Sequence, residues 1–445
     1  MSDDPSIDPA AATTPLRPAP SFRTAAGPAS PAGPASPASP ASPVSPGSPG
    51  NPVASPAPSP PVRGARPSGQ PAREPEAAAS AALLEDALFQ VKRVIVGQDR
   101  MVERTLVCML ARGHCLIEGV PGLAKTLTVS TLATVIGGSF SRMQFTPDLV
   151  PADIVGTRIW RPSREEFDIE WGPVFANIVL ADEINRAPAK VQSALLEVMA
   201  ERQVSIGGHT RRVPDPFLVL ATQNPIESEG VYSLPEAQRD RFLMHIVVTH
   251  PSYEEETEIA RRMSVHPPAA TQTLTTDQLV ALQEACASVF VHHAVADYAV
   301  RLVMATRDPA RWGLAELADQ IALGASPRAT LGLMAAGRAL ALLRGRRFLV
   351  PQDIYDIAPE VMRHRVLLSY DALATGAQAD DVIRRILEVT PAPRVAPHQF
   401  EWSGPGAPTG PGAQTGPTGQ AAPTQPIGPG GPWSWEAPAD RGATA

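Results

Sequence analysis

The sequence predicts an α/β domain built on a parallel sheet, followed by a small all-helical domain and flanked by proline-rich tails. Three observations support this fold class. Short apolar runs alternate with helical patterns over residues 82–250, and only helical periodicity follows over 251–390. Most of the 50 prolines lie in residues 1–75 and 391–445. Alternating strands and helices favour a parallel sheet with crossover helices.

The two tails offer little apolar surface to bury. The first contains PASPAGPASPASPASPVSPGSP, and the second contains GPGAPTGPGAQTGPTGQ. Such compositions cannot offset the entropy lost on ordering, so residues 1–81 and 391–445 are expected to be disordered extensions. A proline-rich ligand for a partner is an alternative in either tail. The working protein is expected to span 82–390.

Five apolar runs predict the strands of the sheet. They lie at 114–119, 141–146, 177–183, 217–224 and 242–248. Continuous apolar runs of this length are typical of strands buried on both faces. Helical patterns occupy 125–138 and 190–204 in the first domain, and 294–308 and 327–345 in the second. Two stretches, 156–174 and 202–217, alternate around polar turns and predict hairpins.

Charge and cysteine usage restrict the class of protein. The net charge of −7 and pI of about 5.8 disfavour a surface that coats nucleic acid. Cys108, Cys115 and Cys286 lack the CxxC spacing of a zinc site and indicate a reducing compartment. No apolar run reaches the roughly 18 residues of a membrane span, and no secretory signal is recognisable at the N-terminus. We expect a soluble, cytoplasmic protein.

The stretch LIEGVPGLAKT, residues 116–126, resembles a phosphate-binding loop. Glycines on a strand-to-helix turn let backbone N–H groups converge on phosphate oxygens. Lys125 would reach the β- and γ-phosphates of ATP, and the Thr126 hydroxyl would ligate Mg²⁺. Ala124 stands where the general pattern has glycine, and it is tolerated if its φ is negative, as expected where a helix begins. An ordinary glycine turn is the alternative.

Acidic residues at the end of a later strand make nucleotide hydrolysis the favoured chemistry. The run NIVLADE ends in Asp182, which can hold Mg²⁺, and Glu183, which can orient and deprotonate water. The run FLVLATQNP ends in Asn224, which can hold the attacking water beside Glu183. An asparagine that starts a turn before Pro225 is the alternative for this position.

Seven motifs together resemble a MoxR-type AAA+ ATPase, in the helix-2-insert clade that is related to magnesium-chelatase ATPase subunits. The resemblance covers roughly residues 85–385. It rests on VIVGQ (94–98), EGVPGLAKT (118–126), QFTPDLVPADIVG (144–156), GPVFANIVLADEINRAPAKVQSALLEVMAE (172–201), ATQNPIE (221–227), LPEAQRDRF (234–242) and GASPRA (324–329). It implies a P-loop AAA+ ATPase domain over 82–250 and a helical lid domain over 251–390. In this family GLAK is the usual loop form, which accommodates Ala124.

The resemblance implies a role for each matching residue. Glu183 would activate water, Asn224 would be sensor 1, and Asp182 would hold Mg²⁺ with Thr126. The residues implied in binding ATP are Val96, Gly97, Gln98, Gly119, Val120, Pro121, Gly122, Leu123, Ala124, Lys125, Thr126 and Asp182. The first three would line the adenine pocket.

The resemblance also implies roles for arginines. Arg241 matches the arginine finger that acts on the ATP of a neighbouring subunit, and Arg328 matches sensor 2 of the lid. Arg239 stands where relatives usually have an apolar residue, so it competes with Arg241 for the finger role. Arg186 can also face the interface. A guanidinium suits this role because it presents paired donors to developing phosphate charge.

The function implied by the resemblance is a ring-forming, hexameric, chaperone-like remodeller. It would help mature or insert a cofactor into a client protein together with a von Willebrand factor A domain partner. The two hairpins would be the helix-2 insert and the pre-sensor hairpin that act on the client. A nucleic-acid motor, with Arg211 and Arg212 on phosphate, and the ATPase subunit of a metal chelatase are the alternatives. The presence of Glu183, a residue that can activate water, disfavours a further alternative, a nucleotide-gated scaffold that does not hydrolyse ATP.

Deletion of both tails tests the predicted extent of the working protein. Removal of residues 1–75 and 405–445 is expected to leave the thermal unfolding midpoint and the basal ATPase rate almost unchanged, because neither segment can contribute a core. Differential scanning calorimetry and a phosphate-release assay measure the two. A fall of several degrees in the midpoint would show that a tail packs on the body.

Overall fold

The computed structural model describes residues 74–225, 231–264 and 268–394. The predicted disorder of 1–73 and 395–445 therefore lies outside the described residues. One predicted boundary is wrong, because helix α1 (Glu74–Val94) begins inside the expected extension 1–81. Its first residues, EPEAAASAALL, are rich in alanine and leucine, which are strong helix formers.

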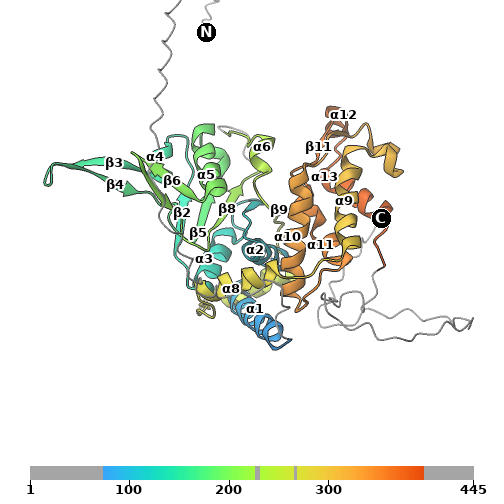
Figure 1. Cartoon of the computed structure of the whole chain (residues 1–445), viewed down its shortest axis with the longest axis horizontal. Coiled ribbons are helices and arrows are strands. Elements are labelled where there is room, and N and C mark those ends of the chain that lie inside the picture. Colours follow the sequence, from blue (N-terminus) through green and yellow to red (C-terminus); the bar gives the residue numbers. More distant parts are fainter. Residues whose placement is uncertain (1–73, 226–230, 265–267, 395–445) are drawn as a thin grey trace, which may run out of the picture. The chain divides into compact units, whose positions relative to one another are not determined.

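A five-stranded parallel sheet forms the centre of the first domain (Figure 1). Its strands are β1 (Cys115–Glu118), β2 (Phe140–Gln144), β5 (Ile178–Asp182), β8 (Leu218–Gln223) and β9 (Met244–Val247). The order across the sheet is β2-β5-β8-β1-β9, and every pair is parallel. All five carboxyl ends therefore meet at one edge, and the predicted fold class is confirmed.

Helices cover both faces of this sheet. Residues of α2 (Asp99–Leu110) and α3 (Lys125–Ile136) share one hydrophobic core with Ile178 and Leu180 of β5. The next residues along the strand, Val179 and Ala181, belong to a second core with α4 (Pro151–Val155) and α5 (Ala189–Glu201). Successive side chains of a strand point to opposite faces, so β5 is apolar throughout because both faces are buried.

Two antiparallel hairpins interrupt the first domain where the sequence predicts them. Strand β3 (Gly156–Arg161) pairs with β4 (Glu166–Trp171), and this hairpin extends away from the sheet (Figure 1). Strand β6 (Gln203–Ile206) pairs with β7 (His209–Arg212). Gly207 and Gly208 join them with φ of +56° and +85°, the left-handed pair that a two-residue hairpin turn favours.

The second domain is built mainly from helices. They are α7 (Tyr253–Met263), α8 (Thr276–Ala287), α9 (His293–Arg307), α10 (Pro327–Leu343), α11 (Pro351–Met362), α12 (Tyr370–Ala374) and α13 (Ala379–Val389), with short 3-10 turns at Ala310–Trp312 and Ala315–Leu317. The prediction of an all-helical domain is wrong in one detail. Strand β10 (Ile321–Leu323) pairs with β11 (Leu367–Leu368), and strands this short are too brief to show a period in the sequence.

A buried arginine joins the helical domain to the sheet domain. Arg365, which follows α11, donates to the carbonyls of Phe242 (2.7 Å) and Leu243 (3.2 Å) and to the Asp240 carboxylate (2.7 Å). These acceptors lie between the short helix α6 (Glu236–Arg239) and β9. Such charge-assisted bonds with a buried guanidinium hold the start of β9 against the end of α11.

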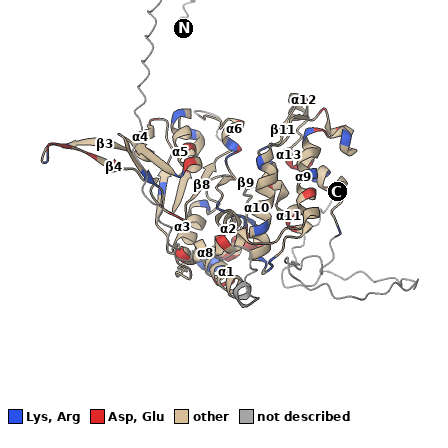
Figure 2. Ribbon diagram, in the orientation of Figure 1, with Lys and Arg blue, Asp and Glu red and all other residues tan. Residues whose placement is uncertain are grey.

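Basic and acidic residues are interspersed along the described elements of both domains (Figure 2). None of the helices in the described ranges combines the length and the apolar character needed to cross a bilayer.

Candidate active site

The phosphate-binding loop predicted from the sequence connects β1 to α3. Gly119 follows the strand, and Lys125 is the first helical residue. Gly119 is closely packed, because a Cβ there would lie only 3.0 Å from the carbonyl oxygen of Val248. Gly122 has a φ of +87°, which favours glycine, and a Cβ would meet no atom within 4 Å. The loop is therefore closely packed at its start and open at its turn.

The prediction of a negative φ for Ala124 is wrong. Its φ is +56°, in the left-handed region, rather than the negative value expected where a helix begins. A left-handed residue immediately before the first helical one turns the chain from the loop into the helix, and glycine does this without cost. An alanine here costs about 1–2 kcal/mol. The loop therefore holds a strained residue at the position where the general pattern has glycine.

Lys125 lies beside the acidic pair. Its Nζ donates to the carbonyl of Gly119 at 2.5 Å, so the side chain curls back over the loop. Burial lowers the pKa of Lys125, and the nearby carboxylates of Asp182, Glu183 and Glu118 partly oppose this effect. The lysine and both acids are therefore close enough to interact electrostatically at the carboxyl edge of the sheet.

A buried threonine positions the acidic pair. Thr222 on β8 donates its hydroxyl to Asp182 Oδ1 at 2.7 Å. The hydroxyl oxygen of Thr222 in turn accepts the backbone N–H of Glu183 at 2.9 Å. Asp182 ends β5, and Glu183 takes a left-handed conformation with φ of +56°, which starts the turn Ile184–Arg186. The two acids are thus held by one hydroxyl from the neighbouring strand.

Two residues of β2 also contact the acids, and the sequence analysis missed them. Arg142 donates to Asp182 Oδ2, from Nη2 at 2.7 Å and from Nε at 3.1 Å. Gln144 donates to Glu183 Oε2 at 2.8 Å, and Arg186 Nε lies 3.1 Å from the same oxygen. The available signal was an arginine and a glutamine at alternate positions of a run predicted to be buried on both faces.

The remaining residues expected around a nucleotide lie on neighbouring segments. Asn224 directly follows β8 and is buried. Gly97 and Gln98 are both left-handed, with φ of +64° and +54°. Gln98 donates its side-chain amide to the carbonyl of Thr249 at 2.9 Å. Val248, the residue before Thr249, lies against Gly119 of the loop. Residues 248–249 therefore connect Gln98 to the phosphate-binding loop.

A contact between a histidine and a glutamate lies at the base of the loop. His245 on β9 lies with Nε2 2.9 Å from Glu118 Oε2, at the last residue of β1. This hydrogen bond lowers the pKa of Glu118, although burial opposes the effect. Arg363 after α11 donates to the carbonyl of His245 at 2.8 Å and pairs with Asp380 at 2.9 Å. The base of the loop is therefore connected to the helical domain.

The two finger candidates and the sensor 2 arginine occupy different surroundings. Arg241 is exposed and donates to the carbonyl of Leu196 on α5 at 2.6 Å. Arg239 is half-buried, 3.8 Å from Glu236. Arg328 in the first turn of α10 lies 3.6 Å from Asp240, the residue between the two finger candidates. Arg241 is thus the more exposed of the two candidates.

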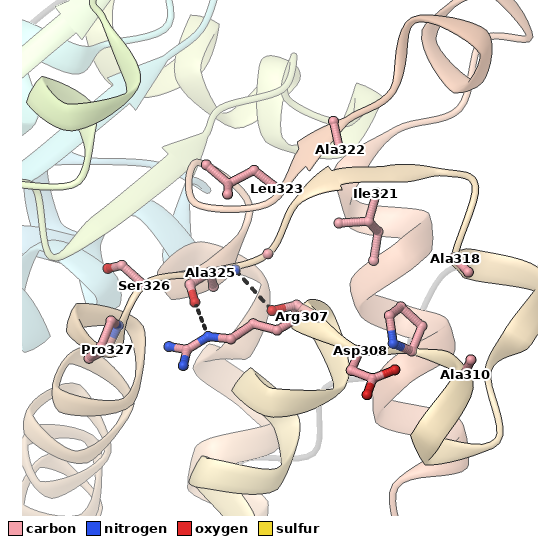
Figure 3. A pocket seen from close by; sticks show the side chains of 13 residues that line it. Arg307, Asp308, Ala310, Ala318, Ile321, Ala322, Leu323, Ala325, Ser326 and Pro327 are labelled. Atoms are coloured by element: carbon pink, nitrogen blue, oxygen red, sulfur yellow. Dashed lines mark hydrogen bonds between the residues drawn. The ribbon is translucent and has the colours of Figure 1, made fainter.

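A cavity of about 600 Å³ lies elsewhere, within the helical domain (Figure 3). It is lined by the end of α9, by β10 and by the start of α10, and Arg307 and Asp308 are the charged residues of its lining. Arg307 Nε donates to the carbonyl of Ala325 at 2.8 Å, which fixes one wall. The cavity borders Ser326 and Pro327, just before Arg328, but none of the loop or acidic residues lines it.

The chemistry of the donors at the sheet edge suits Mg²⁺ with a nucleotide. Thr126 and Asp182 offer hard oxygen ligands, which Mg²⁺ prefers, and it usually keeps waters and phosphate oxygens as its other ligands. In residues 74–225, 231–264 and 268–394 no three His, Cys, Asp or Glu side chains gather to hold a metal alone. A glycine loop, a lysine, an acidic strand end and a helical second domain define a P-loop AAA+ ATPase.

Comparison with known proteins agrees with this class of protein. Residues 114–244 match the ATPase family associated with various cellular activities (AAA), and residues 315–386 match the AAA lid domain. Chaperone MoxR1 of Mycobacterium tuberculosis is 62% identical over 318 residues, covering 72% of this chain and 84% of that protein. Protein MoxR of Methylorubrum extorquens is 34% identical over 330 residues, covering 68% and 93%.

A solved structure also matches. The crystal structure of a protein from Cytophaga hutchinsonii, assigned as an ATPase, superposes with a TM-score of 0.69 at 42% identity. It covers 72% of this chain and 98% of that one. The chain belongs to the MoxR family of AAA+ ATPases.

Substitution of Ala124 tests the strained loop. Ala124→Gly is expected to bind a fluorescent ATP analogue at least as tightly as the wild type, because glycine adopts a positive φ freely. Ala124→Val is expected to bind at least about tenfold more weakly, because a β-branched residue is a severe outlier there and each 1.4 kcal/mol of strain is tenfold in affinity. Equal affinity of all three proteins would show that ATP binding does not depend on a left-handed residue at position 124.

Proposed function

We propose that the chain hydrolyses Mg²⁺–ATP at the loop and acidic pair, and that it uses this energy as a chaperone-like remodeller. The observation that carries the proposal is the placement of Asp182 and Glu183 by Thr222 beside Lys125. Bound Mg²⁺ would neutralise charge on the β- and γ-phosphates, with Thr126 and Asp182 holding it.

The chain's own residues would perform the remaining steps. Backbone N–H groups of Gly119–Thr126 would bind the phosphates, and Lys125 would exchange its bond to the Gly119 carbonyl for a phosphate oxygen. Glu183 would take the proton of the attacking water, and Asn224 would orient that water. Val96–Gln98 would face the adenine, and Arg328 would leave Asp240 to reach the γ-phosphate from the lid.

The site is completed by a second subunit under this proposal. Arg241 is exposed and tied to α5, and it would project to the ATP of the neighbour in a hexameric ring. Arg239 is half-buried, which favours Arg241 as the finger. Arg186, which pairs with Glu183, would lie near the same interface.

The two hairpins would engage the client protein. Trp160 and Phe167 pair across β3 and β4 with ring centroids 5.0 Å apart, and they are 50% and 59% exposed. A two-stranded hairpin with an exposed aromatic pair offers an apolar contact for a client. Arg211 of β7 lies over Trp171 and Phe175, 5.3 Å and 4.8 Å from the ring centroids. The hairpins therefore contact each other and would move together.

The relatives supply the biological part of the proposal. One of them is named as a chaperone, and we extend that role to this chain. Maturation of a client by cofactor insertion, with a von Willebrand factor A domain partner, is the role that the MoxR resemblance implies. The three cysteines are buried and unpaired, which favours the reducing cytoplasm. Stacking of Arg211 on aromatic rings disfavours the phosphate contact expected of a nucleic-acid motor.

Substitution of Glu183 tests both the chemistry and the client role. Glu183→Gln is expected to bind ATP with near wild-type affinity but to turn over at least about 100-fold more slowly, the scale of a general-base contribution. Lys125→Ala is expected to lose ATP binding. In pull-downs with ATP, Glu183→Gln should retain a client that the triple variant with Trp160→Ser and Phe167→Ser does not. Normal turnover of Glu183→Gln, or equal capture by both baits, would contradict the assigned roles.

Mixing experiments test the role of Arg241. ATPase activity per subunit is expected to rise with protein concentration as rings form, and Arg241→Ala is expected to be about 10³-fold slower. A mixture of Arg241→Ala with Lys125→Ala should regain activity, because some interfaces then pair an intact loop with an intact finger. Arg239→Ala alone should remain active. Concentration-independent turnover by a monomer would refute the ring.

A further inference from the structure

The guanidinium of Arg142 donates hydrogen bonds to the carboxylate of Asp182, which is proposed to bind Mg²⁺. Two of its nitrogens contact the same oxygen, Asp182 Oδ2, at 2.7 Å and 3.1 Å. The other oxygen, Oδ1, accepts the Thr222 hydroxyl at 2.7 Å. The Asp182 side chain is only 12% exposed, whereas that of Arg142 is 50% exposed. Both oxygens of a nearly buried carboxylate are therefore engaged by donors of this chain.

The same arginine also connects the two acids of the site. Its Nη2 donates to Gln144 Oε1 at 3.3 Å, and Gln144 Nε2 donates to Glu183 Oε2 at 2.8 Å. Polarisation along such a chain strengthens each bond, so the position of one acid depends on the hold on the other. A continuous path of hydrogen bonds thus runs from Asp182 through Arg142 and Gln144 to Glu183.

Strand geometry explains why these residues meet. In β2 the residues at 142 and 144 share one face, because side chains alternate along a strand. The parallel register places Gln144 beside Asp182. A buried carboxylate without a counter-ion is costly. Lys125, the other nearby cation, is bonded to Gly119 in this structure, so Arg142 is the cation in contact with Asp182.

We propose that Arg142 is a positioning residue that acts as a tethered counter-ion of Asp182 and must withdraw before this carboxylate can serve Mg²⁺. Its withdrawal removes the donor to Gln144 and so loosens the bond that holds Glu183. Loading of the metal site and release of the water-activating acid are thereby linked. This inference rests on the proposed use of Mg²⁺, and it gives β2 a role in the reaction cycle.

Three variants separate this role from that of an ordinary surface arginine. Arg142→Met removes the charge and keeps the aliphatic length, and Arg142→Lys keeps the charge but loses the paired donors. Arg385→Met is the matched control, because Arg385 is 49% exposed and lies 3.0 Å from Glu316 on the helical domain. Thermal unfolding of each protein without nucleotide checks that it is folded.

The decisive measurement is the Mg²⁺ dependence of nucleotide binding, followed with a fluorescent, non-hydrolysable ATP analogue. Arg142→Met is expected to need about three- to tenfold less Mg²⁺ for half-maximal response, since the competing cation is gone. Arg142→Lys should lie closer to the wild type, and Arg385→Met should match it.

Other outcomes would overturn the inference. An unchanged or increased Mg²⁺ requirement in Arg142→Met would show that the arginine does not compete with the metal. A fall in turnover of tenfold or more at saturating Mg²⁺ would make Arg142 a participant in the reaction itself. If nucleotide binding by the wild-type protein did not depend on Mg²⁺, both this inference and the proposed use of the metal would be overturned. A wild-type protein that needs Mg²⁺, with an unchanged requirement in Arg142→Met, would overturn this inference alone.

Discussion

One buried hydroxyl, that of Thr222, holds the two acids on which the site depends. It donates to Asp182 and accepts from the backbone of Glu183, so it serves both residues at once. This is possible because β5 and β8 are parallel neighbours whose register sets Ala181 opposite Ala221. The next residues, Asp182 and Thr222, then lie side by side at the carboxyl edge, where the phosphate loop also begins after β1.

A second constraint links the helical domain to the segment that carries the candidate finger. Asp240 accepts from Arg365 at 2.7 Å and from Ser326, the N-cap of α10, at 2.9 Å, and it lies 3.6 Å from Arg328. Its neighbour Arg241 faces outward. A lid movement that draws Arg328 toward a nucleotide would therefore alter the hold on Asp240, and so the segment that a neighbouring subunit would meet.

The features that depend on apolar runs and on the ends of strands could be predicted from the sequence. It predicted the sheet, the hairpins, and the placement of Lys125 and the acidic pair at one edge. It could not reveal Arg142 and Gln144, because the run around them was treated as buried on both faces, whereas β2 is an edge strand with exposed alternate residues. The left-handed Ala124 was also missed, because backbone conformation at a loop depends on its neighbours rather than on local propensity.

The role of Thr222 is the central claim, and steady-state kinetics of Thr222→Val tests it most directly. Valine keeps the shape of the side chain but removes the hydroxyl, which leaves the Glu183 amide and an Asp182 oxygen without this partner. The account predicts an affinity for ATP within about threefold of the wild type. It predicts a turnover at least about tenfold lower, because two buried hydrogen bonds are lost. Unchanged turnover in a folded Thr222→Val protein would contradict the account.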